Sequence, residues 1–493
     1  MWRAHLILRS CVVVLPMALH VSIAAAQVTQ AARPVVDRVL ADPDVQGAQR
    51  LFSAWLEAQI ENRGLPGVVV AVVADQELVW AKGFGHANVA AKTPMTPDTR
   101  FRMASHSKLF TATAIMQLRE QGKVRLDDPV SQHLSWFRVK PAGDDDGPIT
   151  VEQLLTHSSG LPREADAHWT TLDFPTADEV RALLANREAA FAPSVRWKYS
   201  NLAYTIAGSV VEQASGMSWA DYVTRNIFQP LGMTSSSVDR DVEGLAVAYN
   251  RRMPDGTREV LPFTDSRGMA AATGITSNAI DMAKFVSAQF RTGPRGGNRI
   301  LSTGSLREMH RVRSVENNWT SGTGIGFGVS RVNNRTYIGH GGGYPGYTTQ
   351  TLIDPETKVG VVVLTNSGDG GPGDVARQLM TTVGTVVAKA AAAAVPKAKT
   401  VAWDPSWSRF AGKYRGRGGD TYVVLLNNKL VMFGGNATTL DNLASLEPIG
   451  DGRFRLVSSL GGGAVGEVVR FVEANGRVTR MITGDSYVER VRD

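Results

Sequence analysis

The spacing of hydrophobic residues predicts three elements in the first quarter of the chain. Between residues 44 and 62, apolar residues recur at intervals of one, three and four, which predicts an amphipathic helix ending near Gly64. Residues 67–73 and 77–83 are β-prone runs separated by a short turn, so they predict a hairpin. Residues 109–118 carry apolar residues at helical spacing and predict a helix buried on most sides.

The middle of the chain is predicted to be mostly helical, and strand-like runs return late. Residues 150–216 alternate helical patterns with loops, and helices are expected over 203–214, 218–228, 278–290 (capped by Ser277 or Asn278) and 374–390. Strands are expected over 325–329, 336–340, 347–353 and 359–364, and short turns between the last three favour antiparallel neighbours. An early hairpin and late strands around a helical insertion indicate an α+β fold, with one antiparallel sheet flanked by helices.

A change in composition marks a domain boundary. Residues 391–402 begin with an alanine run and contain Pro396, which is typical of a linker. Beyond them, β-prone runs at 421–426, 429–433, 453–457, 466–472 and 477–482 alternate with Asn, Asp and Gly turns. Residues 403–493 are therefore predicted to form a small antiparallel barrel or sandwich, with a barrel favoured, after a larger first domain over residues 27–390.

The N-terminus has the features of a secretory signal peptide. Arg3 and Arg9 precede an apolar run, and Ala24–Ala26 follow as a small-residue cleavage site, so residues 1–26 are predicted to direct export to the periplasm or the medium. The alternative, an uncleaved anchor, is disfavoured because the apolar run is short for a membrane span. The single cysteine, Cys11, lies inside this segment, so the mature protein is expected to contain neither a thiol nor a disulfide.

The distribution of charge and the spacing of histidines argue against two classes of ligand, nucleic acids and metal ions. The 493 residues carry a formal net charge of +7, but the basic residues are not clustered with aromatic ones, which argues against nucleic-acid binding. No metal or cofactor is predicted, because six histidines lack metal-ligand spacing and are expected to be surface or structural residues. These are His86, His106, His133, His157, His168 and His310.

Three short motifs carry the candidate chemistry. Ser105 and Lys108 stand three residues apart at the start of a predicted helix, so hydroxyl and amine lie on one face about a turn apart. No other lysine has a serine at that spacing, and Tyr199-x-Asn201 and His340-x-Gly342 each occur once. Each motif is at a helix entrance or a strand end, where a cleft can collect side chains, so together they indicate a nucleophile with its activators.

Each motif also has a purely structural interpretation. Ser105 can cap its helix, Tyr199 can be a core aromatic, and the glycines after His340 can form a flexible turn. These interpretations do not explain Lys108, because a cation in the first turn of an apolar helix opposes the helix dipole. An α/β-hydrolase is disfavoured, since the chain has no Gly-x-Ser-x-Gly elbow.

The three motifs resemble the signatures of the serine β-lactamase and penicillin-recognising superfamily. The nearest likeness is to its class C-like branch of D,D-peptidases, D-aminopeptidases and family VIII carboxylesterases, and residues 154–162 are similar to that branch too. The resemblance covers about residues 45–385 and implies a β-lactamase-like fold with an all-helical insertion. The tail resembles the lipocalin-like domain of some members.

The resemblance also implies roles for the motif residues. Ser105 would be acylated, Lys108 and Tyr199 would move its proton, and Asn201 would bind a substrate carbonyl or amide. The backbone amides of Ser105 and Gly343 would form the oxyanion hole, and Gly342 would line the substrate site with His340.

One departure from the β-lactamase pattern bears on the substrate. Where the β-lactamases of this branch usually carry Lys-Thr-Gly, this chain has His340-Gly341-Gly342, and a neutral imidazole holds a substrate carboxylate less firmly than a lysine does. We therefore expect small esters or D-amino-acid peptides to be cleaved better than penicillins. The alternative is a β-lactamase, or a penicillin-binding sensor that is acylated with little turnover. The sequence leaves the acyl substrate and the oligomeric state open.

Overall fold

The chain folds into two compact units, residues 1–395 and 396–493. The computed structural model describes residues 35–143, 147–240, 242–291, 300–316, 318–332, 334–394, 401–440, 443–458 and 465–491. The predicted signal peptide over residues 1–26 lies outside these ranges. Within them, no helix is both long and apolar enough to cross a membrane.

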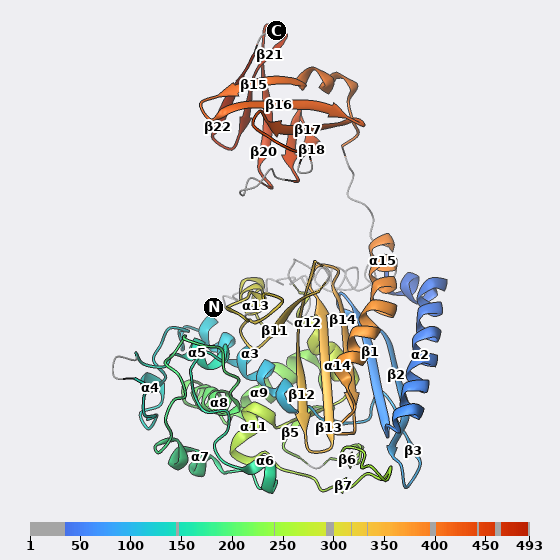
Figure 1. Ribbon diagram of the computed structural model, residues 1–493, viewed down its shortest axis with the longest axis vertical. Coiled ribbons are helices and arrows are strands. Elements are labelled where there is room, and N and C mark those ends of the chain that lie inside the picture. Colours follow the sequence, from blue (N-terminus) through green and yellow to red (C-terminus); the bar gives the residue numbers. More distant parts are fainter. Residues whose placement is uncertain are drawn as a thin grey trace, which may run out of the picture. The chain divides into compact units, whose positions relative to one another are not determined.

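An antiparallel sheet forms the centre of the first unit (Figure 1). Across the described residues its nine strands have the order β3-β2-β1-β14-β13-β12-β11-β10-β9. The predicted hairpin pairs with the late strands, with Val70 opposite Val363, which confirms one sheet built from both ends of the unit. The strands are β1 (Gly67–Ala74), β2 (Glu77–Asn88), β3 (Thr93–Pro94), β9 (Ser314–Val315), β10 (Ser321–Thr323), β11 (Gly328–Val332), β12 (Arg335–Tyr344), β13 (Tyr347–Asp354) and β14 (Val359–Thr365).

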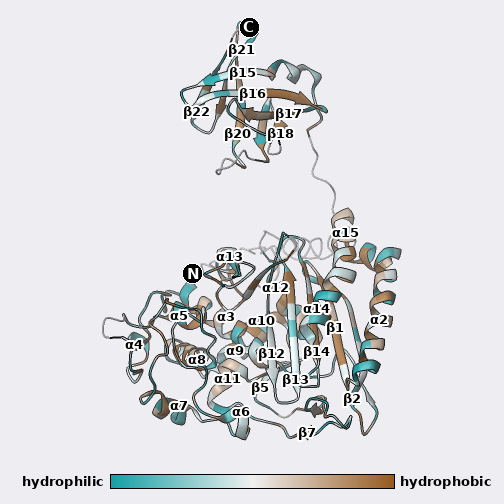
Figure 2. Cartoon of the chain, in the orientation of Figure 1, coloured by the Kyte–Doolittle hydropathy of each residue, from teal (hydrophilic) through white to brown (hydrophobic). Residues whose placement is uncertain are grey.

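Helices cover both faces of this sheet, and β1 shows why. Its eight residues are all buried, and alternate side chains enter different cores. Val68, Val70 and Val72 pack in a core with α2 (Pro43–Arg63) and α14 (Pro372–Leu379), whereas the odd-numbered residues face the core that contains α3 (Ser107–Glu120) and α12 (Ala279–Ala288). β1 is accordingly among the most hydrophobic strands of the unit (Figure 2).

The helical insertion lies beside the sheet and contains short helices joined by loops, as predicted. Its helices are α4 (Val130–His133), α5 (Val151–Leu155), α6 (His168–Thr171), α7 (Ala177–Leu184), α8 (Asn201–Ser215), α9 (Trp219–Val223) and α10 (Gln229–Leu231). Further helices of the unit are α11 (Ala270–Thr273), α13 (Thr303–His310) and α15 (Thr385–Ala394). Two small sheets complete it, one of β4 (Phe101–Arg102), β8 (Ile275–Ser277) and β5 (Ser237–Val238), and one of β6 (Ala248–Tyr249) and β7 (Val260–Leu261).

Three predicted boundaries are wrong in detail. The strand expected at 325–329 begins only at Gly328, because Gly326 has a φ of +81° and turns the chain. The helix expected over 218–228 becomes a π-helical turn after Val223. The closing helix is interrupted by a π-helical turn at Met380–Gly384 and then runs through Ala394, into the segment predicted as linker, because alanine has the highest helix propensity. Of the two predicted caps of α12, Asn278 is the one whose side chain accepts from the Asp281 amide.

The second unit is a closed antiparallel barrel, which is the favoured one of the two predicted architectures. Its described strands are β15 (Gly412–Gly416), β16 (Gly419–Leu426), β17 (Lys429–Gly434), β18 (Ala444–Gly450), β19 (Arg453–Leu456), β20 (Val468–Ala474), β21 (Arg477–Thr483) and β22 (Ser486–Arg490). Pairing of Tyr414 with Arg490 closes the barrel, and Tyr414, Phe454 and Val469 lie in its core. The sequence did not predict β15, β18 and β22, whose residues are largely polar or include Pro448.

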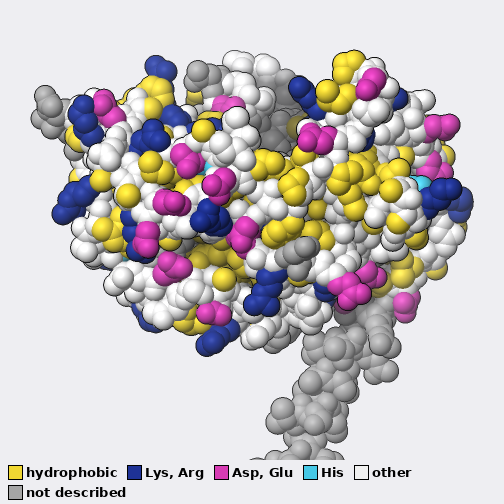
Figure 3. All heavy atoms as spheres, turned by 90° about the horizontal axis from the view of Figure 1, so that it is seen from below, with side chains coloured by type: hydrophobic (Ala, Val, Ile, Leu, Met, Phe, Trp, Pro, Cys, Tyr) yellow, Lys and Arg dark blue, Asp and Glu magenta, His cyan; other side chains and the backbone are white. Residues whose placement is uncertain are grey.

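Charged side chains of both signs are interspersed on the face of the molecule drawn in Figure 3. That distribution agrees with the spread of charge along the sequence.

Candidate active site

Ser105 lies in a tight turn immediately before α3. The turn spans Ala104–His106, and Ala104 has a φ of +53°, a conformation that side chains rarely adopt. The Ser107 hydroxyl braces the turn, because it donates to the Ala104 carbonyl at 2.8 Å and accepts from the Ile275 amide at 3.0 Å. Ser105 is partly exposed between buried neighbours, so its hydroxyl is the accessible group of the turn.

Lys108 holds the Ser105 hydroxyl from one side. Its Nζ lies 3.0 Å from Ser105 Oγ and 3.0 Å from the Ala272 carbonyl, and the side chain is fully buried. Burial disfavours the charged form and lowers the pKa of Lys108 to about 7. Near neutral pH this amine can therefore accept a proton.

Tyr199 holds the same hydroxyl from the other side. Its OH donates to Ser105 Oγ at 2.8 Å, and burial raises the pKa of the phenol to about 12. Tyr199 lies on the loop that enters α8, and the side chain of the following residue, Ser200, caps that helix by accepting from the Ala203 amide at 2.9 Å. The predicted meeting of hydroxyl, amine and phenol is present in the structure.

The glycine-rich end of β12 lies against the nucleophile turn. A Cβ at Gly342 would stand 2.6 Å from the Met103 carbonyl and 3.1 Å from the Ala104 Cβ, so only glycine fits there. A Cβ at Gly343 would meet nothing within 4 Å. Pairing with β11 ends at Gly339, so beyond that residue β12 has no partner strand on this side within the described part of the chain.

His340 lies close to the reacting groups and is uncharged near pH 7. Its ring centre is 6.4 Å from that of Tyr199 and 6.0 Å from that of His106. Burial, together with the nearby Lys108, lowers the pKa of His340 to about 4. His340 and Tyr199 line a cavity of about 340 Å³ whose wall also includes Trp197 and Gln350.

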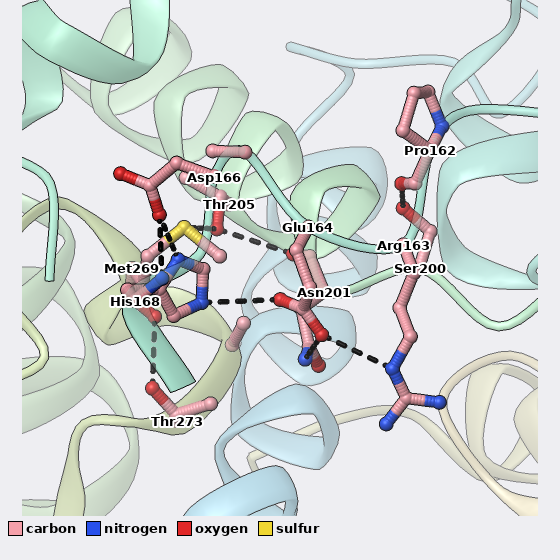
Figure 4. A network of polar contacts seen from close by, with 12 residues as sticks. Pro162, Arg163, Glu164, Asp166, His168, Ser200, Asn201, Thr205, Met269 and Thr273 are labelled. Atoms are coloured by element: carbon pink, nitrogen blue, oxygen red, sulfur yellow. Dashed lines mark hydrogen bonds and ion pairs between the residues drawn. The ribbon is translucent and has the colours of Figure 1, made fainter. Parts of the chain in front are cut away.

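Asn201 is held next to the site by Glu164, a residue that the sequence did not single out. Asn201 Nδ2 donates to Glu164 Oε1 at 2.6 Å, as Figure 4 shows. The Asn201 side chain is almost fully buried, and its Oδ1 has no hydrogen-bond partner among the described residues. The sequence predicted that Asn201 binds substrate; in the structure its NH₂ group is already bound to Glu164.

Comparison with known proteins assigns the family. The family model named beta-lactamase matches residues 52–384, about two thirds of the chain. The chain belongs to the beta-lactamase family. Protein flp of Staphylococcus aureus strain COL is 23% identical over 322 residues, which are 65% of this chain and 63% of that protein. The chain therefore matches less than two thirds of the length of this relative.

Solved structures of beta-lactamase-like proteins agree with that assignment. The octameric penicillin-binding protein homologue from Pyrococcus abyssi is 26% identical, with a TM-score of 0.61, over 89% of this chain and 98% of that one. EstCE1, a hydrolase with promiscuous acyltransferase activity, is 26% identical, with a TM-score of 0.57, over 70% of this chain and 99% of that one. The family is one of serine hydrolases, and its members share the fold described above.

Three of the histidines expected to be surface or structural surround the site of this beta-lactamase-family chain. His106 is buried against β12 and β13, with its Nε2 3.2 Å from Thr351 Oγ1. The ring of His157 packs 4.3 Å from that of Tyr199, and its Nδ1 accepts from the Ser200 amide at 3.2 Å. His168 pairs with Glu164, at 3.2 Å. These three residues shape the site. For His157 the sequence did contain a signal, because it lies in the segment 154–162 that resembles the family.

The other three histidines lie elsewhere. His86 is exposed, His133 lies 2.9 Å from Asp128 Oδ2, and His310 lies 3.2 Å from Gln289 Oε1. Among the residues that the structure describes, no group of three or more His, Cys, Asp or Glu side chains is arranged to hold a metal ion.

Proposed function

We infer that this protein is a serine hydrolase that cleaves small esters or amides through an acyl-enzyme on Ser105. The observation that carries the inference is the pair of hydrogen bonds on one hydroxyl, from Lys108 Nζ at 3.0 Å and from Tyr199 OH at 2.8 Å. A serine held by a near-neutral amine and a phenol has the features of an activated nucleophile.

The proposed reaction begins with attack of Ser105 Oγ on the acyl carbon while neutral Lys108 accepts the hydroxyl proton. Tyr199 donates a proton to the departing alcohol or amine and is reprotonated from the Lys108 ammonium. Water then attacks the ester of Ser105 and releases the acid. The backbone amides of Ser105 and Gly343 are the proposed donors to the oxyanion in both steps, since a donor placed where charge develops lowers the barrier most.

The substrate class follows from the neutral imidazole at the third motif. His340 has a pKa of about 4, so it offers no positive charge to a substrate carboxylate at pH 7. We therefore favour esters and D-amino-acid peptides over penicillins, in the manner of an esterase or D-aminopeptidase. The likeness to EstCE1 supports an acyl-transfer chemistry of this kind.

The second candidate is a penicillin-binding sensor that is acylated with little turnover, or a β-lactamase. The likeness to the Pyrococcus abyssi penicillin-binding protein homologue favours this alternative. In either case the predicted signal peptide would place the protein in the periplasm or outside the cell, acting on a small molecule without a cofactor.

A covalent probe tests the proposal. A fluorophosphonate should label the wild type and fail to label Ser105→Ala, and labelling that persists in the variant would remove Ser105 as the nucleophile. Steady hydrolysis of a p-nitrophenyl ester, compared with a stoichiometric burst that stops, separates the enzyme from the sensor. A panel of short esters, D-alanyl peptides and a chromogenic cephalosporin then ranks the substrates.

A further inference from the structure

A largely buried carboxylate that belongs to none of the three motifs lies beside the proposed nucleophile site. Glu164 has a side chain only 15% exposed. Its Oε1 accepts from Asn201 Nδ2 at 2.6 Å and from Arg163 Nε at 3.1 Å, and its Oε2 lies 3.2 Å from His168 Nε2. In Figure 4 the carboxylate occupies the centre of this group, with Arg163 and His168 on opposite sides of it.

The network keeps Glu164 ionised. Burial opposes the charge, but the neighbouring His168 and Trp169 side chains and the hydrogen bond from Asn201 outweigh it and hold the pKa of Glu164 below its ordinary value. His168 is fully buried and its Nδ1 contacts Asp166. Although burial opposes the imidazolium, the two carboxylates raise the pKa of His168 above its ordinary value.

An ionised carboxylate fixes the direction of the Asn201 amide. Because a carboxylate can only accept hydrogen bonds, the NH₂ group of Asn201 must face Glu164, and its oxygen must point away. A neutral residue of the same shape would permit either orientation. Glu164 therefore determines which end of the Asn201 amide is presented beside Tyr199.

The same carboxylate balances the cations around Tyr199. Lys108 Nζ lies 5.0 Å from the centre of the Tyr199 ring, and the Arg163 guanidinium lies 5.2 Å from it. Glu164 accepts a hydrogen bond from Arg163, and its negative charge favours the protonated form of Lys108. Without it, the repulsion between Lys108 and Arg163 near this ring would have less compensating charge.

We propose that Glu164 is a positioning residue of the site: its carboxylate orients the Asn201 amide and supplies the counter-charge for Lys108 and Arg163. This rests on the proposed function, because the effect is on acylation of Ser105. Glu164 touches none of the reacting atoms and acts through Asn201 and Lys108.

The proposal has a consequence for the pH dependence of acylation. Removing the negative charge makes it easier for Lys108 to lose its proton, so the acid limb of kcat/KM should move to lower pH in Glu164→Gln. A substitution that only loosened the fold would lower the plateau without moving the limb. The groups of the described residues that face Lys108 or Glu164 from neighbouring elements are His106, His157, Arg163, Asp166, His168, Lys198, Tyr199, Tyr204 and His340.

Most of these groups do not change charge near the acid limb. The pKa of His106 is about 3 and that of His340 about 4, and burial holds the pKa of His157 well below its ordinary value. Both tyrosines have pKa values raised by burial. His168 is the exception, since its pKa is raised, and it pairs with the very carboxylate that is substituted.

The test compares pH profiles of the full-length wild type, Glu164→Gln, Glu164→Asp and the exposed control Glu188→Gln, with fluorophosphonate labelling rate and p-nitrophenyl ester kcat/KM as readouts. Glu164→Gln should lower the plateau of kcat/KM on the order of 10- to 100-fold and shift the acid limb to lower pH. Glu164→Asp keeps the charge but shortens the reach to Asn201, so it should lower the plateau and leave the limb in place. Glu188→Gln should match the wild type.

Unchanged kcat/KM in Glu164→Gln, or a lower plateau with an unmoved limb, would overturn the proposal. If Glu164→Gln does not fold, Glu164→Asp decides together with its urea midpoint: a reduced plateau with the wild-type limb and the wild-type midpoint supports the proposal. Wild-type kinetics, a shifted limb, or a lower plateau that comes with a lower midpoint overturns it. Failure of the wild type to react at Ser105 would instead refute the proposed function, so the two failures are distinguishable.

Discussion

The buried Lys108 should make the first unit less stable than a chain without that charge, and the deficit should depend on pH. The perturbation is Lys108→Met, which keeps the length of the side chain and removes the amine. Holding Lys108 protonated costs about 5 kcal/mol below pH 7, from 1.36 kcal/mol for each pH unit between its ordinary pKa of 10.5 and about 7. The variant leaves the Ala272 carbonyl without its donor, which costs about 1–3 kcal/mol. We therefore expect a net gain of roughly 2–4 kcal/mol in the free energy of unfolding at pH 6.

The sign of the pH dependence follows from proton binding. Between pH 7 and 10.5 the unfolded chain holds a proton on Lys108 that the folded chain has released. The stability of the wild type relative to the variant should therefore rise with pH across this window. The advantage of Lys108→Met should be greatest below pH 7 and should disappear, or reverse, toward pH 10.

Urea unfolding of both proteins at pH 6, 8 and 9.5, followed by tryptophan fluorescence, measures this difference, and Lys123→Met on the exposed surface is the control. Labelling of Ser105 should fall at least about 100-fold in Lys108→Met, because proton transfer is lost. A wild type more stable than Lys108→Met at pH 6, or a difference that does not change with pH, would refute the idea that burial holds this amine near neutrality.

Three further predictions concern packing, a buried ion pair and the third motif. Gly342→Ala should lower kcat/KM about 100-fold, because the added methyl group overlaps the nucleophile turn. Gly341→Ala should have a mild effect, since its methyl group would meet only the flexible end of a glutamine side chain. Measuring kcat/KM for both variants tests this difference. Asp239→Asn should reduce the free energy of unfolding by about 3 kcal/mol, since it leaves the buried Arg102 without its carboxylate partner, and urea denaturation would show an unchanged midpoint if the pair were unimportant. His340→Lys should lower KM for a carboxylate-bearing cephalosporin relative to a neutral ester, and an unchanged ratio of the two KM values would contradict the role assigned to the uncharged imidazole.

Local spacing predicted the parts of the site that depend on local geometry. Ser105 and Lys108 meet because they are three residues apart, a spacing that brings two side chains to one face of a helix. This spacing can be seen in the sequence. Tyr199 could be added because the motifs resemble those of a known superfamily. The sheet was predictable as well, because β1 is apolar at every position and has to be covered on both faces.

The contacts of Glu164 could not be read from the sequence. Its partners Asn201 and His168 lie on two different helices, and the loop conformation that brings the carboxylate between them has no periodic signal. Likewise, the polar strand β22 is held in place by its pairing with β21 on one side and β15 on the other. Both the contacts of Glu164 and the strand β22 depend on residues far apart in the sequence, which local propensity does not encode.

The pairing of β1 with β14 has a consequence for how the chain is made. Val68 to Ala74 are synthesised early, but their partners from Val359 to Thr365 emerge roughly 290 residues later. At about 5–20 residues per second a ribosome needs on the order of 15–60 s to supply them. During that interval a valine-rich strand has an open edge in the nascent chain, and an edge of this kind is prone to pair with other chains.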